Sequence, residues 1–83
     1  MNVVLSKNAR KDYEHLPKPE RTKVRKKLAF LEQNPYAGKK LSGELEGIRT
    51  VRAWPYRLFY EVNETEKRID VHKIKHRQGV YKN

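Results

Sequence analysis

Apolar residues recur at helical spacing in the first third of the chain and alternate with polar residues in the second half. A short apolar run at residues 3–5 predicts a first strand. Ser6 follows this run and is a suitable N-cap for a helix that Pro17 ends. The apolar stripe of that helix consists of Ala9, Tyr13 and Leu16.

A second helix is predicted from Pro19, which suits the first turn of a helix, to about Gln33. The short Pro-Lys-Pro connection between the two helices indicates an antiparallel hairpin. One face of the second helix is apolar, with Val24, Leu28 and Leu31. Much of its remaining circumference is basic, with Lys23, Arg25, Lys26 and Lys27.

Three strands are predicted after a loop at residues 38–47, and they span residues 48–54, 56–63 and 68–75. Pro55 predicts a tight turn between the first two of them. The order predicts an α+β fold with an N-terminal strand, a helical hairpin and a three-stranded antiparallel run, the helices packing on one face of the sheet. We expect residues 1–83 to form a single domain.

Alternation along the central strand predicts which side chains face the helices. The mostly apolar set consists of Tyr56, Leu58, Tyr60 and Val62, which leaves Arg57 on the open face. The last strand changes phase, because Ile69 and Val71 share a register with the lysines whereas Ile74 does not. A bulge would reconcile the two halves, and Arg77 would then point outward beside Arg57.

The charge balance changes the functional picture more than any other bulk property. The chain has 20 Lys and Arg against 10 Asp and Glu, a net charge of +10 on 83 residues. Such a charge predicts attraction to a polyanion, although solvated lysine-rich helix faces are the simpler alternative. The absence of cysteine excludes disulfides and thiolate metal sites. With no signal peptide or membrane-spanning run, we expect a cytoplasmic protein without a membrane partner.

Four side chains near the end of the chain could cleave RNA through its own 2′-hydroxyl, without a metal or cofactor. Arg57 and Arg77 suit the charge that develops on phosphate, and His76 and Tyr81 can transfer protons. Each also has a structural interpretation: the arginines as surface charges, His76 as a hydrogen-bonded core residue, and Tyr81 as an anchor. We interpret His15 and His72 as structural. Trp54 could stack on a base, although packing is the simpler role.

The ordered set of motifs resembles the RelE/ParE toxin superfamily over nearly the whole chain. The motifs are Leu41-x-Gly43, Gly47-Ile48-Arg49, Arg52 to Tyr60, and His76-Arg77-x-x-Val80-Tyr81. The resemblance implies the toxin of a type II toxin–antitoxin system, and in RelE-type members a ribosome-dependent endonuclease that cuts mRNA in the A site and inhibits translation. It also implies a cognate antitoxin as partner, and leaves open binding of the toxin–antitoxin complex to operator DNA.

The same resemblance implies roles for individual residues. Arg57 and Arg77 correspond to arginines that stabilise the scissile phosphate, and Tyr81 to a C-terminal tyrosine used for proton transfer or stacking. His76 stands at a position that varies among members. The expected RNA-binding residues, which include ribosomal RNA contacts of the second helix, are Arg49, Arg52, Lys73, Lys75, Arg25, Lys26 and Lys27.

Two other functions remain open from the sequence. The ParE branch of the superfamily shares the fold and inhibits DNA gyrase without cutting RNA. A basic nucleic-acid-binding module with no toxicity would also explain the charge. The combination of Arg57, Arg77 and Tyr81 favours the nuclease.

Overall fold

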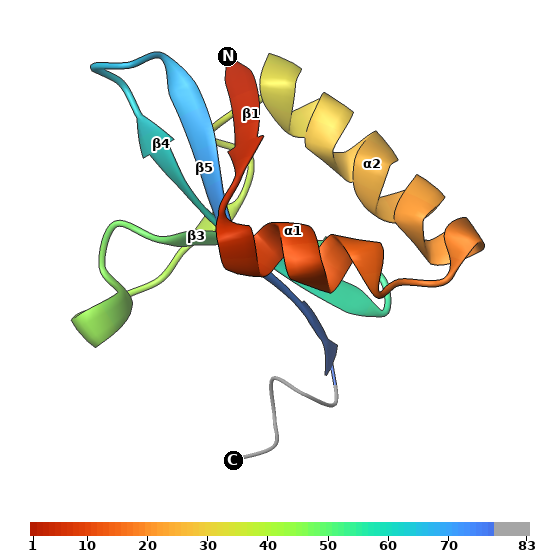
Figure 1. Cartoon of the computed structure of the whole chain (residues 1–83). Helices are drawn as coiled ribbons and strands as arrows, with labels where there is room; N and C mark the ends of the chain where they lie inside the picture. Colours follow the sequence, from red (N-terminus) through yellow and green to blue (C-terminus); the bar gives the residue numbers. More distant parts are fainter. Residues whose placement is uncertain (78–83) are drawn as a thin grey trace.

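The structure, a computed structural model, describes residues 1–77 of the chain. It contains two α-helices, one short 3-10 helix and five strands, which Figure 1 labels in chain order. The elements are β1 (Asn2–Leu5), α1 (Lys7–Glu14), α2 (Lys18–Gln33), β2 (Lys39–Lys40), η1 (Gly43–Leu45), β3 (Arg49–Ala53), β4 (Tyr56–Asn63) and β5 (Arg68–His76). The predicted α+β fold is therefore confirmed, including the N-terminal strand and the helical hairpin.

All five strands form one sheet in the order β1-β5-β4-β3-β2. The pairings of β2, β3, β4 and β5 are antiparallel, whereas β1 lies parallel to β5. The loop predicted at residues 38–47 is more ordered than expected, because it contains β2 and η1. Strand β2 pairs with β3 at Thr50 and Arg49, and so it covers one end of the β3 edge.

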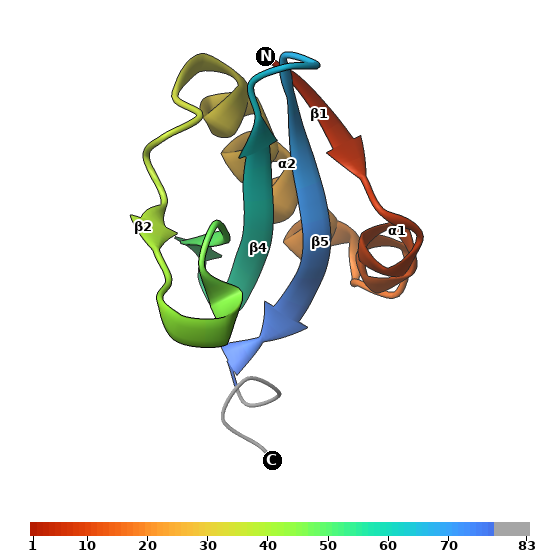
Figure 2. The ribbon, with the colours of Figure 1, turned by 90° about the vertical axis from the view of Figure 1, so that its left-hand side faces the viewer.

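The helices pack against one face of the sheet, as predicted, and leave the other face open. Figure 2 shows α2 behind β4 and β5, with α1 beyond the β1 edge. The fully buried side chains come from both layers: Ala9, Val24 and Leu31 from the helices, and Leu58, Tyr60, Ile69 and Val71 from the strands. Neither helix of residues 1–77 has the length and hydrophobicity of a membrane span.

A β-bulge in β5 resolves the change of phase seen in the sequence. Phe59 lies opposite Lys73 while its neighbour Tyr60 lies opposite Val71, so His72 is an extra residue on β5. Val71 before the bulge and Ile74 after it are consequently both buried. The predicted bulge is thus confirmed, and Lys73 and Lys75 both reach the open face.

Two side chains of the first helix region attach α1 to the edge of β5. The Ser6 hydroxyl accepts a hydrogen bond from the Ala9 N–H (3.0 Å) and donates one to the carbonyl of His72 (2.8 Å). The Asp12 carboxylate accepts a hydrogen bond from the Ile74 N–H at 2.9 Å. Because β1 pairs with β5 as far as Val71, these contacts continue the edge where that strand pairing ends.

The β3–β4 connection is the tight turn that Pro55 predicts. Trp54 and Pro55 form a two-residue turn, and the peptide bond between them is cis. The N–H of Arg77 donates a hydrogen bond to the carbonyl of Pro55 at 2.8 Å. This bond brings the residue that follows β5 against the turn, and the candidate site lies there.

Candidate functional site

Three cationic side chains cross the open face of the sheet in one row. Arg52 on β3 lies opposite Arg57 on β4, and Arg57 lies opposite Lys75 on β5. Residues that pair directly across antiparallel strands project from the same face, so the three charges are neighbours. Asp12 partly offsets this charge, because its carboxylate is 3.7 Å from the Lys75 ammonium.

Three arginines surround a cavity at the β3–β4 turn, which we name the arginine pocket. Its volume is about 210 Å³. Its lining consists of Arg52, Trp54, Pro55, Tyr56, Arg57 and Arg77. No Asp or Glu of residues 1–77 contributes to this lining. Guanidinium groups donate pairs of hydrogen bonds to phosphate oxygens, and so the pocket suits a phosphate or phosphodiester.

The indole of Trp54 orients one of these arginines. The guanidinium carbon of Arg77 is 5.0 Å from the centroid of the Trp54 ring, a cation–π contact. Trp54 remains 57% exposed, so it packs on Arg77 at the surface and is not part of the core. The structure therefore adds Trp54 to the candidate site, and its sequence signal was an aromatic residue between two arginines at a strand end.

His76 lies directly behind the arginine pocket and packs on one of its lining residues. It pairs across the sheet with Tyr56, and the two rings meet edge to face with centroids 5.3 Å apart. Both side chains are half-buried. Tyr81, the fourth residue predicted to take part in cleavage, lies outside the described residues.

Comparison with known families identifies the relatives of this fold and site. Residues 3–81 match the family described as the ParE toxin of type II toxin-antitoxin system, parDE. The chain belongs to this ParE toxin family. The match confirms the resemblance to the RelE/ParE superfamily and includes every element that surrounds the arginine pocket. None of the curated proteins compared matches the chain in sequence.

Solved structures similar to this ParE-family chain include RelE and YoeB proteins. A chain of the RelBE2 toxin–antitoxin complex from Mycobacterium tuberculosis is 27% identical, with a TM-score of 0.84 over 90% of this chain and 95% of that one. The archaeal RelE–RelB complex from Pyrococcus horikoshii gives 26% identity and a TM-score of 0.74, covering 92% and 93% of the two chains. The YoeB dimer from Staphylococcus aureus gives 26% identity and a TM-score of 0.75, and the match covers 92% of this chain and 95% of that one.

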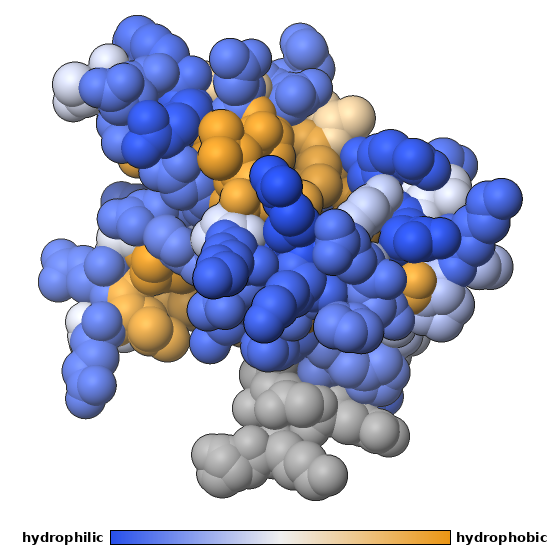
Figure 3. Space-filling model, viewed as in Figure 1, coloured by the Kyte–Doolittle hydropathy of each residue, from blue (hydrophilic) through white to orange (hydrophobic). Residues whose placement is uncertain are grey.

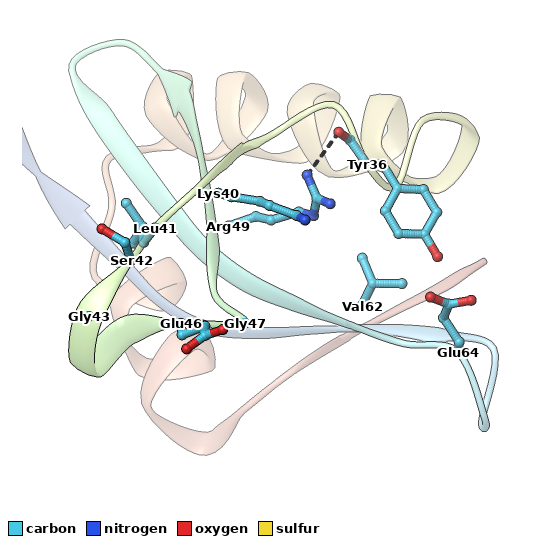
Figure 4. A pocket seen from close by; sticks show the side chains of 10 residues that line it. All are labelled: Tyr36, Lys40, Leu41, Ser42, Gly43, Glu46, Gly47, Arg49, Val62 and Glu64. Atoms are coloured by element: carbon cyan, nitrogen blue, oxygen red, sulfur yellow. Dashed lines mark hydrogen bonds between the residues drawn. The ribbon is translucent and has the colours of Figure 1, made fainter.

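Arg49 of this ParE-family chain lies apart from the arginine pocket. It pairs with Tyr60 on the helix-facing side of the sheet, and its guanidinium donates to the carbonyls of Tyr36 (3.2 Å) and Gly38 (2.9 Å). Figure 4 shows it inside a separate cavity of about 690 Å³, to which Glu46 and Glu64 also contribute. Its geometry is that of a residue holding the loop after α2, and its contact with RNA stays a prediction.

The open face carries a further cavity of about 560 Å³ between α1 and η1. Phe59 contributes to it, with the ammonium of Lys73 4.9 Å from the centroid of its ring. Leu45 on η1 is 48% exposed, and Figure 3 shows apolar atoms at η1 on an otherwise largely hydrophilic surface. The His72 ring nitrogen Nε2 is 2.9 Å from the Glu61 carboxylate beside this cavity, which agrees with a structural role for that histidine. Residues 1–77 contain no group of three His, Asp or Glu side chains arranged to hold a metal ion.

The predicted basic residues of α2 divide between two positions. Lys26 and Lys27 line a groove that borders Trp54, and Lys23, another basic residue of α2, lines it with them. Arg25 is exposed and does not contribute to this groove. The structure thus brings Arg52, Arg57 and Arg77 together with Trp54, and places two of the predicted α2 lysines next to them.

Proposed function

We propose that this chain is the toxin of a type II toxin–antitoxin system and acts as a ribosome-dependent, metal-independent endoribonuclease on mRNA in the A site. The arginine pocket carries the proposal, because three guanidinium groups share one small cavity with no acidic side chain of residues 1–77 in its lining. Such a cavity holds a phosphodiester and stabilises negative charge that grows on it. The RelE resemblance implies the same reaction.

In the proposed reaction, the 2′-oxygen of the ribose attacks the adjacent phosphorus atom and the bond to the 5′-oxygen breaks. One group takes the proton of the 2′-hydroxyl, and another gives a proton to the leaving oxygen. Arg57 and Arg77 stabilise the phosphorane-like charge, while Tyr81 and His76 carry the protons. The products are a 2′,3′-cyclic phosphate and a 5′-hydroxyl.

The proposed partners follow from the charge and from the relatives. Two of the similar structures are complexes of RelE-type and RelB-type proteins, which supports a cognate antitoxin for this chain. The net charge of +10 favours binding to ribosomal RNA and mRNA through sequence-independent phosphate contacts. We place the protein in the cytoplasm, where translating ribosomes are its target, and we include operator DNA as a ligand of the antitoxin complex.

The decisive test is in vitro translation with purified protein, followed by mapping of mRNA 5′ ends with and without ribosomes. The wild-type protein should cut inside A-site codons when ribosomes are present. Arg57→Ala combined with Arg77→Ala should abolish the cuts while the far-UV circular dichroism spectrum is unchanged. Lys67→Gln, in the turn at the other end of β4, removes a charge far from the pocket and should cut normally. A folded double variant that still cuts would refute the residue assignment.

Inhibition of DNA gyrase is the second candidate function, and the match to the ParE toxin family favours it. It predicts loss of supercoiling activity at protein concentrations that leave translation intact. A supercoiling assay run beside the translation assay separates the two functions. Intact mRNA together with inhibited gyrase would replace the nuclease with this alternative.

A further inference from the structure

The arginine pocket opens beside a second concave surface, which we name the α2 groove. It lies between α2 and β3 and has a volume of about 380 Å³, within the ~300–1,000 Å³ range of small-ligand sites. Its lining consists of Lys23, Lys26, Lys27, Phe30, Arg52, Ala53 and Trp54. Arg52 and Trp54 line both the groove and the arginine pocket, so the two sites are adjacent.

The groove combines cations with exposed aromatic rings. Phe30 is 43% exposed and Trp54 is 57% exposed, although most large apolar side chains of the fold are buried or half-buried. The ammonium of Lys27 is 4.9 Å from the centroid of the Phe30 ring. Lys23 contacts Glu20 at 3.4 Å, and no acidic residue of the described chain lines the groove itself.

Cations interleaved with flat aromatic rings are typical of surfaces that bind single-stranded nucleic acid. Lysines follow the phosphates, and each unstacked base finds a ring to stack on, whatever its sequence. An acidic protein segment would satisfy the lysines but would not need two exposed rings. In a double helix the bases stack on one another, so they are not available to stack on the two rings. The observations therefore favour single-stranded RNA as the occupant.

We infer that the α2 groove is a binding subsite for a nucleotide adjacent to the scissile phosphate, with Phe30 and Trp54 stacking on its base. The inference rests on the proposed RNA substrate and assigns it a second point of attachment. Trp54 then has two roles: it holds Arg77 by the cation–π contact and contributes one wall of the base subsite. Lys26 and Lys27 neutralise the phosphates of the same strand.

Trp54 is the single tryptophan of the chain, and so its fluorescence reports on this site alone. The probe is a single-stranded 2′-O-methyl oligoadenylate, which lacks the attacking hydroxyl and stays intact, titrated without ribosomes. We expect it to quench the Trp54 emission. Inorganic polyphosphate, which has charge but no bases, should bind and leave the emission unchanged. Phe30→Ala should weaken oligoadenylate binding by about 5- to 150-fold, the range for losing one stacked base.

Two control variants match the changes in the groove. Tyr36→Ala removes an exposed ring that also lies under an arginine, Arg49 at 5.1 Å, but outside the groove. Lys67→Gln is the control for the groove variant Lys27→Gln: it removes the same charge, but from the turn at the far end of β4. Both controls should bind the oligoadenylate like the wild type, except that Lys67→Gln loses a small part of the long-range electrostatic attraction.

Three results would overturn the inference. They are an unchanged emission at saturation with oligoadenylate, equal quenching by polyphosphate, and equal effects of Phe30→Ala and Tyr36→Ala. A shift of the emission by poly-glutamate but not by oligoadenylate would likewise assign the groove to an acidic protein segment. The binding assay contains no ribosome, so a protein that fails to cut mRNA yet shows the Phe30-dependent quenching would refute the nuclease and keep the subsite.

Discussion

Arg52 and Arg57 lie directly opposite each other in the β3–β4 ladder, and both line the arginine pocket. Like charges at directly paired positions destabilise a sheet, because the side chains are held close together. A phosphate placed between the two would remove this repulsion. Residues of the pocket should therefore show opposite effects on stability and on binding.

Arg52→Gln should raise the melting temperature and weaken RNA binding at the same time. Relief of the cross-strand repulsion is worth roughly 0.2–1 kcal/mol, or about 1–8 °C for a domain of this size. The salt dependence of oligoadenylate binding should fall by about one phosphate contact. Thermal unfolding and a salt titration measure the two effects. Lys67→Gln, with the same loss of charge, should leave the melting temperature unchanged, and an Arg52 variant that melts below wild type would contradict the repulsion.

Gly38→Ala should destabilise the fold by about 1–3 kcal/mol, the usual cost of overpacking. An added Cβ would stand 2.5 Å from the Tyr60 hydroxyl oxygen and 2.9 Å from the carbonyl oxygen of Thr50. The backbone carbonyl cannot rotate away, so the loop after α2 must shift. Urea unfolding gives the change in free energy. Ala37→Gly, at the neighbouring position, is the control for loop flexibility, and a Gly38→Ala protein as stable as wild type would show that the loop adapts freely.

Stability should decline above pH 10, in part because of Tyr60. Burial raises the pKa of this phenol above its ordinary value of 10.0, and the Gly38 N–H bond and the charge of Arg49 lower the pKa by a smaller amount. A raised pKa means that the unfolded chain loses the proton first. The stabilisation is complete below pH 10 and disappears as the pH rises through the pKa of the folded state.

Tyr60→Phe isolates this contribution. The hydroxyl accepts from the Gly38 N–H (2.8 Å) and donates to the Pro35 carbonyl (2.9 Å), so its loss should cost about 1–3 kcal/mol at pH 7. The difference in unfolding free energy between wild type and variant should then shrink as the pH rises above 10. A difference that stays constant with pH would exclude Tyr60 as the titrating group.

Asp12→Ala should destabilise the sheet edge more than Asp12→Asn does. The alanine leaves the Ile74 N–H without its acceptor and should cost about 1–3 kcal/mol, whereas the asparagine oxygen can still accept that bond. Both variants remove the negative charge near Lys75 and should strengthen oligoadenylate binding equally. Denaturant unfolding and fluorescence titration separate the two effects, with Asn8→Ala as the control on the same helix. Equal destabilisation by both variants would mean that charge, not the hydrogen bond, holds the edge.

The faces of the central strand could be predicted from the sequence because β4 alternates without interruption. Leu58 and Tyr60 are buried against the helices and Arg57 is on the open face, as the period of two requires. The bulge in β5 could be expected but not located, since His72 and Lys73 are both polar and either could be the extra residue. The register of β4 and β5 places the extra residue at His72, whose carbonyl accepts the hydrogen bond of Ser6 from 66 residues away in the chain.

The separation of Arg49 from Arg52 also follows from alternation, because positions three apart on a strand face opposite sides of the sheet. Other features depend on how distant elements pack together. The stacking of Arg77, which follows β5, on Trp54 in the β3–β4 turn joins residues far apart in the chain, and no local pattern encodes it. The α2 groove likewise requires the packing of α2 beside β3, which brings Phe30 and Trp54 to one surface.

The parallel pairing of β1 with β5 has a consequence for the synthesis of this protein. β1 is synthesised before β5 and can pair with it only after β5 has been made, and the Ser6–His72 bond can close only then. Arg77 also joins the pocket at this step. A nascent chain therefore cannot complete the arginine pocket until β5 and Arg77 have left the exit tunnel.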